Sequence, residues 1–469
     1  MPALAGILAA VWLAVVSGCG SGDSLPDDGR TQAADEQVRA KWGKPLDELP
    51  TATLAVISPH NENIRNEFQW AFSLHHAVEH GQKVVFEWRT VGGGSGTIFS
   101  YLREVYSQRD SSGIDILWGG GEFNFIPLAR EGIFQPMSLA PDVLANIPET
   151  LGSARMYDPN LRWIGAAISA FGYLYNVEML RRCRIAPPDG TWDDLADRRF
   201  ADLIVLADPT QSGSAAAAYQ MIVRSGESWP AGWGKLLLIL ANAKRFTDSA
   251  GTAANAPGLG EALVATAIDF YGAVRVAEAP SRLVYVSPRG QTAFTPDPIA
   301  ILKNPPHPQL AKRFIDFCMS AKGQALWALR VGEADGPVRS PLGRQPIRRD
   351  VYDRYAGRMI PSIVNPFEVG QAMSLEGHRG RISYGVLREL VRAAAVDNTD
   401  GLRSARDALV RSGYDAALLA EFQRLPDDAD TLDKMAAVAT GMKNKKEEHR
   451  IITGWQRFFG DKYQRIAAR

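Results

Sequence analysis

The chain has 469 residues, of which 46% are hydrophobic and 22% are charged. One hydrophobic core stops growing at roughly 250 to 300 residues, so this length predicts two lobes and an appendage. Lysine plus arginine equals aspartate plus glutamate, at 52 each, and this balance gives no support to binding of nucleic acid.

The N-terminus predicts export and lipid anchoring. Residues 4–16 are apolar over a length that is too short to span a bilayer but suits the core of a signal peptide. Small residues precede Cys19, and a polar linker follows, which resembles the bacterial lipobox. We therefore expect a signal peptide over 1–18, acylation of Cys19 and a linker over 19–50, so that the lipid holds the protein to a membrane in the cell envelope. The alternative is an apolar N-terminal helix with an incidental buried cysteine.

Strands and helices alternate after the linker. Apolar runs rich in β-branched residues predict strands over 51–58, 83–90, 114–118 and 202–207. Helical spacing of apolar residues predicts helices over 62–80, 97–108, 122–131, 214–224, 232–241, 259–271 and 312–329. Successive strand–helix units predict a mainly parallel sheet covered by helices.

The order of these elements predicts an α/β protein with two lobes. Two segments rich in β-forming residues, 163–176 and 283–301, are expected to cross between the lobes as hinges. We assign 51–165 and 296–345 to the first lobe, 166–295 to the second lobe, and 346–469 to a helical C-terminal extension. In that extension the charge run over 443–450 is interpreted as a solvated helix face, and the aromatic residues that follow are expected to pack onto the body.

Cysteine and histidine give no support to a disulfide or a metal site. Cys183 and Cys318 fall in different lobes and are predicted to be buried free thiols. His76 and His80 share a helix face, next to His75, but no carboxylate or cysteine nearby completes a ligand set. We expect solvent-exposed histidines there and no bound metal.

Polar and glycine-rich loops follow the predicted strands. Ligands of open parallel sheets bind beyond the carboxyl ends of the strands, where helix N-termini favour anions. One such loop could serve only as a cap or a turn, but four that converge favour a ligand site. We predict that the site consists of Ser58, His60, Asn61, Gly93, Gly94, Ser95, Trp118, Gly119, Gly120, Thr210, Ser212, Gly213, Ser214 and Ser249.

Arg65 is a secondary candidate in this site, because it lies one helical turn beyond Asn61 and could add a cation. A solvated surface arginine is the alternative. The glycine-rich loops lack the lysine of a P-loop, the third glycine of a dinucleotide fingerprint and the serine elbow of a hydrolase. We therefore predict neither catalysis nor a cofactor.

Three stretches occur in the order typical of a known family: YNVEML at 175–180, PPDGTWDDL at 187–195 and ADPTQSGS at 207–214. DILWGG at 115–120, DPIAILK at 297–303 and AKRFIDF at 311–317 extend the pattern. Over about residues 50–345 the chain resembles the extracellular solute-binding proteins of ABC importers, of the ferric-iron type. The resemblance implies a type II periplasmic-binding fold with two crossing hinge strands, a ligand in the cleft, and delivery to a membrane permease with its ATPase.

The resemblance leaves the solute open, because members of this family bind ferric ion, polyamines, thiamine, phosphonates or sugar phosphates. Ferric binders typically present adjacent tyrosines, whereas this chain has separated Tyr173 and Tyr285, which with Asp297 are secondary candidates. We expect a monomer that captures a small anionic or phosphate-bearing solute. A ferric-iron binder and a ligand sensor for a membrane signalling partner are the alternatives.

Overall fold

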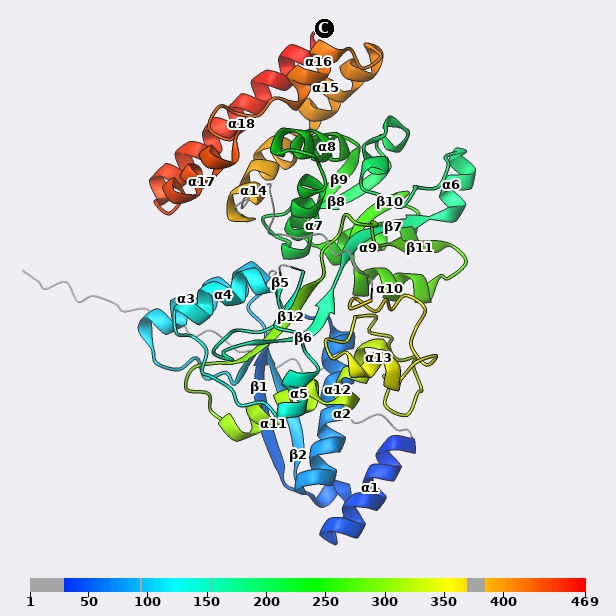
Figure 1. Cartoon of the computed structure of the whole chain (residues 1–469), viewed down its shortest axis with the longest axis vertical. Coiled ribbons are helices and arrows are strands. Elements are labelled where there is room, and N and C mark those ends of the chain that lie inside the picture. The colour runs from blue at the N-terminus through cyan, green and yellow to red at the C-terminus, as the bar shows by residue number, and fades with distance from the viewer. Residues whose placement is uncertain (1–28, 93–94, 153, 369–383) are drawn as a thin grey trace, which may run out of the picture.

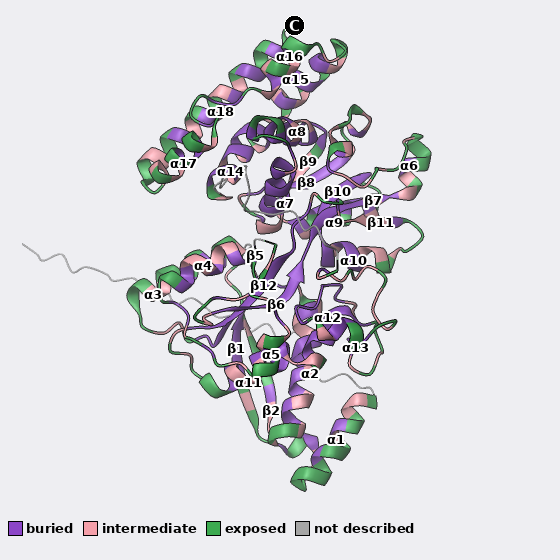
Figure 2. Ribbon diagram, viewed as in Figure 1, coloured by how far each residue is buried: buried purple, intermediate pink, exposed green. Residues whose placement is uncertain are grey.

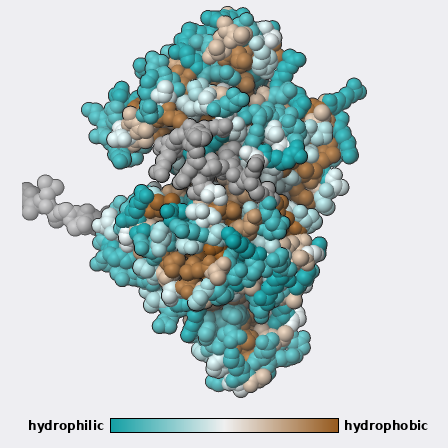
Figure 3. All heavy atoms as spheres, in the orientation of Figure 1, coloured by the Kyte–Doolittle hydropathy of each residue, from teal (hydrophilic) through white to brown (hydrophobic). Residues whose placement is uncertain are grey.

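The computed structural model describes residues 29–92, 95–152, 154–368 and 384–469, and its strands form two five-stranded sheets and a short two-stranded ribbon (Figure 1). Each large sheet is the centre of one lobe. The ribbon, β4 (Thr150–Leu151) with β5 (Ala154–Arg155), is an excursion of the first lobe. Hydrophilic side chains cover most of the molecular face drawn in Figure 3.

The first lobe has the strand order β2-β1-β3-β12-β6. The first three of these strands run parallel, and β12 is antiparallel to both of its neighbours. The strands are β1 (Thr51–Ile57), β2 (Lys83–Arg89), β3 (Ile116–Trp118), β12 (Thr295–Ile301) and β6 (Ile164–Ser169). The helices of this lobe are α2 (Glu62–His80), α3 (Ser95–Gln108), α4 (Glu122–Arg130), α5 (Pro141–Ala145), α11 (Pro308–Met319) and α12 (Ala321–Ala328).

Both faces of this first sheet are buried. Along β1, Leu54 and Val56 belong to one apolar cluster, whereas Ala55 and Ile57 belong to another on the opposite face. Successive side chains of a strand point to opposite faces, so this division means that helices cover the sheet on both sides. Purple ribbon at the centre of each lobe shows the same burial (Figure 2).

The second lobe has the strand order β11-β7-β10-β8-β9. β8 runs parallel to β9 and β10, while β7 is antiparallel to β10 and β11. The strands are β7 (Phe171–Asn176), β8 (Ile204–Ala207), β9 (Ala243–Thr247), β10 (Val264–Ile268) and β11 (Leu283–Val286). The helices are α6 (Val177–Cys183), α7 (Gly213–Arg224), α8 (Trp229–Ala241), α9 (Ala250–Leu259) and α10 (Asp269–Glu278), with 3-10 turns at Asp193–Ala196 and Arg198–Phe200.

Two stretches of chain join the lobes. Strand β6 of the first sheet passes through Ala170 directly into β7 of the second sheet, and residues 287–294 lead from β11 back to β12 (Figure 1). Crossing strands of this kind lie within the two segments that the sequence predicted as hinges. The α/β fold with two lobes is thereby confirmed.

The C-terminal helices pack on the second lobe. They are α14 (Tyr384–Val391), a π-helical turn (Arg392–Val396), α15 (Thr399–Arg411), α16 (Ala416–Gln423), α17 (Leu432–Gly441) and α18 (Lys445–Ala467). The indole of Trp229 in α8 donates to the carbonyl of Ala429, and the ring centroids of Trp233 and Phe459 are 6.0 Å apart. The terminal aromatic residues therefore pack as predicted. Residues 346–368 instead contact the first lobe, where α13 (Asp350–Arg354) lies against α12.

The helix predicted over 259–271 is wrong. The structure divides this segment into the end of α9, the buried strand β10 and the start of α10. A short apolar run that is buried on all sides has no periodicity to distinguish strand from helix. The helix predicted over 312–329 is likewise two helices, because Ser320 is extended and its hydroxyl caps α12 by accepting from the amide of Gly323.

Three further expectations need correction. The linker predicted over 19–50 contains the helix α1 (Gly29–Trp42), whose Val38 is buried against α2, and a 3-10 turn at Leu46–Glu48. Cys183 is exposed at the end of α6, while Cys318 is a buried free thiol. His76 is fully buried, with its Nδ1 2.8 Å from the carbonyl of Gln82. Cys19 lies outside the described residues.

Candidate ligand-binding cleft

A cavity of about 820 Å³ lies between the two lobes. Pockets for small molecules usually have volumes of about 300 to 1,000 Å³, so the cavity is large enough for a solute of sugar size. The first lobe contributes the starts of α3 and α4, the second lobe contributes the starts of α7, α9 and α10, and the crossing strands form the base. The lining residues of these helix starts include Ser95, Glu122, Phe123, Ser212, Gly213, Ser214, Ser249, Ala250, Gly251 and Phe270.

The helix starts turn backbone N–H groups toward this space. The first N–H groups of a helix have no acceptor within the helix, and the helix dipole gives them partial positive charge. At α7 and α9 the serine caps satisfy only the third helical residue, since Ser212 Oγ accepts from the amide of Ala215 and Ser249 Oγ accepts from that of Thr252. No acceptor among the described residues pairs with the preceding amides of either helix, so these amides are open to a ligand. Such an arrangement favours an anion.

A buried charged group forms the base of the cavity. Asp297 in β12 accepts from Nε2 of His60 at 2.6 Å, from the amide of Gly120 at 3.1 Å and from the guanidinium of Arg344. All three side chains are less than a tenth exposed. A Cβ on Gly119 would lie 2.7 Å from His60 Nε2, so only glycine lets the loop after β3 approach the imidazole.

Burial and charge act in opposite directions on this group. Burial raises the pKa of Asp297, but attraction to Arg344 and His60 outweighs it and holds the pKa well below the usual value. Burial lowers the pKa of His60 and outweighs the opposing effect of Asp297, and the charge of Arg344 lowers that pKa further. His60 is therefore neutral at neutral pH, with its proton on Nε2 facing the carboxylate. Its buried Nδ1, which has no protein partner among the described residues, is left as an acceptor.

Arg344 is held between aromatic rings. Its guanidinium carbon lies 4.2 Å from the ring centre of Phe270 and 5.6 Å from that of Trp327. Within the described part of the chain, its buried Nε has no hydrogen-bond acceptor, and neither has the buried hydroxyl of Ser169. Both residues line the cavity. Because unpaired buried polar groups are costly, these atoms favour a ligand with acceptor oxygens.

Asp269 lies at the hinge behind this group. Its carboxylate accepts from the amide of Ala170, between β6 and β7, at 2.9 Å and from its own neighbour Phe270 at 2.8 Å. Burial raises the pKa of Asp269 to about 7, although Arg344 attracts the charged form. A carboxyl group that titrates near neutral pH therefore contacts a crossing segment.

Residues 119–342 match the family model described as bacterial extracellular solute-binding protein. The match covers slightly less than half of the chain. A curated relative, the phosphoglycerate transport regulatory protein PgtC of Salmonella typhimurium, is 26% identical over 165 residues, which is 35% of this chain and 40% of PgtC. The match thus spans less than half the length of that relative.

Solved structures share the fold of this chain. The periplasmic binding protein AfuA from Actinobacillus pleuropneumoniae, bound to fructose-6-phosphate, has a TM-score of 0.53 and 17% identity over 76% of this chain and 98% of AfuA. Iron-bound HitA from Pseudomonas aeruginosa has a TM-score of 0.50 and 19% identity over 68% of this chain and 92% of HitA. Identities this low show the fold and not the solute.

The cleft between the lobes brings together nine of the residues predicted from sequence. They are His60, Ser95, Gly120, Thr210, Ser212, Gly213, Ser214, Ser249 and Asp297. Gly93 and Gly94 lie outside the described residues. Predicted residues that do not line the cavity are Ser58, Asn61, Arg65, Trp118, Gly119, Tyr173 and Tyr285.

The predicted residues outside the cavity have other contacts. Ser58 Oγ accepts from the amide of His60, and Asn61 caps α2 by accepting from that of Ile64. Trp118 is fully buried among the rings of the first lobe, with its centroid 4.9 Å from that of Phe68. Arg65 lies over Trp88. Tyr173 and Tyr285 lie in β7 and β11 of the second sheet, and the hydroxyl of Tyr285 donates to the carbonyl of Ala170.

Sequence reasoning missed several lining residues. Arg344 follows the last matched family residue, and no local pattern separates it from the other arginines of that segment. Phe270 and Tyr271 fell inside the wrongly predicted helix. Tyr384 and Arg388 come from α14, beyond the region of resemblance. Only the spatial arrangement shows that these side chains reach the cleft.

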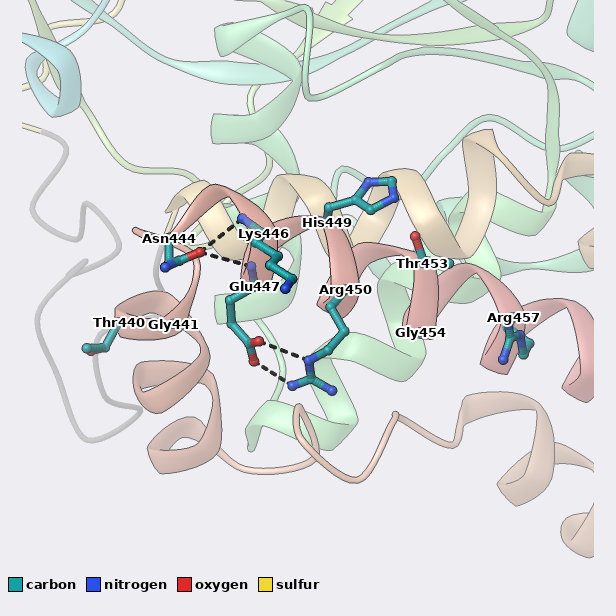
Figure 4. Close-up of a pocket in the computed structure, with 10 residues that line it drawn as sticks. All are labelled: Thr440, Gly441, Asn444, Lys446, Glu447, His449, Arg450, Thr453, Gly454 and Arg457. Atoms are coloured by element: carbon teal, nitrogen blue, oxygen red, sulfur yellow. Dashed lines mark hydrogen bonds and ion pairs between the residues drawn. The ribbon is translucent and has the colours of Figure 1, made fainter.

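A second hollow, of about 900 Å³, follows α18 and the end of α17. Figure 4 shows its side chains spread along the helices, with Glu447 paired to Arg450 and Asn444 capping the start of α18. These groups satisfy one another on an open surface. Among the described residues no helix is both long and apolar enough to cross a bilayer, and no cluster of three histidine, cysteine or acidic side chains is placed to hold a metal.

Proposed function

We propose that the protein captures a small anionic solute, most simply a hydroxylated phosphate ester, in the cleft between its lobes. The observation that carries this proposal is the convergence of helix N-termini from both lobes on a cavity with Arg344 at its base. Oriented N–H groups and a guanidinium are the donors that phosphate oxygens accept from.

The charge of the cavity supports an ester rather than a bare polyanion. Among the described residues, the cavity is lined by three arginines, Arg103, Arg344 and Arg388, and by three carboxylates, Glu122, Asp248 and Asp297. The carboxylates can accept from hydroxyl groups, and His60 Nδ1 adds a neutral acceptor. Fructose-6-phosphate in AfuA and the name of PgtC agree with this class of solute.

In this proposal the protein performs no chemistry on the solute and delivers it to an ABC permease with its ATPase. The family match supports an extracytoplasmic site of action. Acylation of Cys19 would keep the protein at the membrane. Ferric coordination gains little support, because one of the two tyrosines that line the cleft, Tyr384, already donates to the carbonyl of Gly213.

A thermal-shift panel tests the solute class. It compares fructose 6-phosphate, 3-phosphoglycerate, inorganic phosphate, fructose, spermidine and ferric citrate. A ligand that binds only the folded state raises its stability, by about 2.7 kcal/mol at one hundred times its dissociation constant. We expect stabilisation by the phosphate esters and none by fructose. Stabilisation by spermidine or ferric citrate alone would reject the proposal.

The name of PgtC, a transport regulatory protein, favours one second candidate, a sensor that reports the solute to a membrane signalling partner. Reconstitution with the candidate permease and ATPase separates the two. Delivery predicts that the loaded protein stimulates ATP hydrolysis, whereas a sensor leaves that rate unchanged.

A further inference from the structure

The C-terminal extension reaches the solute cavity through α14. Tyr384 and Arg388 are four residues apart, so they share one face of this helix, and both line the cavity. Val386, Leu387 and Leu390 are buried on the rest of the helix, which packs against α7 of the second lobe (Figure 1). The extension therefore contributes a wall to the cleft.

Tyr384 contacts both lobes at once. Its hydroxyl donates to the carbonyl of Gly213, the first residue of α7, at 2.8 Å. Its ring lies stacked on Phe123 of α4 in the first lobe, with centroids 5.4 Å apart and planes 12° apart. This side chain joins the extension, the second lobe and the first lobe at the cavity.

Arg388 differs from the other two arginines that line the cavity in the described part of the chain. Arg344 donates to Asp297, and Nε of Arg103 lies 2.9 Å from a carboxylate oxygen of Glu131. The carboxylate that pairs with Arg388, that of Glu389, is 3.6 Å from its Nε, which is too far for a hydrogen bond. Burial also raises the pKa of Glu389. Arg388 thus faces the cavity with the weakest carboxylate pairing of the three.

We propose that Tyr384 and Arg388 are specificity-determining residues of the solute site. Arg388 binds an anionic group of the solute beside the N-terminus of α7, and Tyr384 holds α14 against both lobes when the cleft is closed. This inference rests on the proposed function. It assigns part of the solute site to an extension that lies outside the matched family region.

Isothermal titration calorimetry with fructose 6-phosphate tests the role of Arg388. A hydrogen bond to a charged group contributes about 1.5 to 3 kcal/mol, so Arg388→Gln should weaken binding roughly tenfold to a hundredfold. Arg388→Lys keeps the charge and should retain more affinity than the glutamine variant. The matched control Arg411→Gln changes an exposed arginine of α15 and should bind as the wild type does.

Tyr384 is tested with the same probe. Tyr384→Phe removes the hydroxyl that bonds Gly213 but keeps the ring, whereas Phe123→Ala removes the stacked partner. Both should weaken binding, with thermal unfolding of the solute-free protein as the check on folding. Failure of the wild type to bind any phosphate ester rejects the proposed function itself. Wild-type binding together with unchanged affinity in Arg388→Gln and Tyr384→Phe rejects this inference alone.

Discussion

Asp297, His60 and Arg344 depend on one another at the base of the cleft. The carboxylate is buried, and its charge is tolerated because Arg344 and two N–H donors surround it. Loss of one partner leaves an uncompensated buried charge, whereas loss of both charges together does not. The free energy of unfolding should therefore fall by less, for each residue replaced, when Asp297 and Arg344 are replaced together than when either is replaced alone.

Arg344→Met is expected to lower the free energy of unfolding by about 3 kcal/mol, the usual cost of breaking a buried ion pair. Combined with Asp297→Asn, the loss should be smaller than the sum of the two single losses. Urea unfolding of the four proteins in this cycle measures the coupling. Additive losses would show that the two side chains do not stabilise each other.

Asp269 should make the stability of the protein depend on pH. Its pKa is raised by burial to about 7, so between about pH 4 and pH 7 the folded protein binds more protons than the unfolded chain. This carboxyl group should make stability fall as pH rises through that range. Chemical denaturation at several pH values should show a flatter profile for Asp269→Asn, and a profile identical to the wild type would contradict the assignment.

At the scale of residues, local pattern predicted only part of the cleft. Ser212 was predicted because it lies in a polar loop after a predicted strand, and in the structure it also caps α7. Asn61 was predicted in the same way but caps α2 outside the cavity. Arg344 carries no local signal, since its position depends on rings from two distant helices, Phe270 and Trp327.

At the scale of elements, α7 and α8 meet at a glycine. A Cβ on Gly232 would lie 1.9 Å from the carbonyl oxygen of Val223, at the end of α7. The start of the same helix lines the cavity, so this contact helps to fix a wall of the cleft. Gly454 in α18, in contrast, has open space around it.

Gly232→Ala is expected to destabilise the protein by about 1 to 3 kcal/mol, because backbone must move to admit the methyl group. The matched substitution Gly454→Ala should stabilise it by roughly 0.5 to 1 kcal/mol through helix propensity. Thermal unfolding of both variants provides the comparison. Equal effects would mean that the close approach of α7 and α8 is not rigid.

Helix α2 has a clear helical period of apolar residues, and the sequence predicted it correctly. It spans Glu62–His80, which are the predicted bounds, between its N-cap Asn61 and its C-cap Gly81, where φ is 64°. Strand β10 was missed because it is buried on all sides and flanked by helices with equally apolar residues. Local propensity could not distinguish a strand from a helix there, because the strand is stabilised by pairing with β7 and β8, which are distant in sequence.

At the scale of the whole molecule, the lobes touch across the cleft. A Cβ on Gly213 of the second lobe would lie 3.0 Å from Ser95 Oγ of the first lobe. This contact and the stack of Phe123 on Tyr384 are expected only when the hinge is closed. The family resemblance predicted two lobes and hinges from sequence. It ends near residue 345, so it could not predict how the C-terminal extension packs on the second lobe.

A disulfide trap measures closure. With the exposed Cys183 replaced by serine, the pair Ser95→Cys and Gly213→Cys should oxidise faster when fructose 6-phosphate is present, because the solute favours the closed state. Each single variant is the control for disulfides between molecules. A rate that does not depend on the solute would contradict hinge closure around it.

The central claim is that the cleft holds an anion against the helix N-termini and Arg344. A crystal structure of the protein purified without added solute, or soaked with fructose 6-phosphate, tests it most directly. We predict density for a phosphate group within hydrogen-bond distance of the amides at the start of α7 or α9, with Arg344 or Arg388 as a further donor. Density for a metal ion, or a solute bound only in the groove along α18, would contradict it.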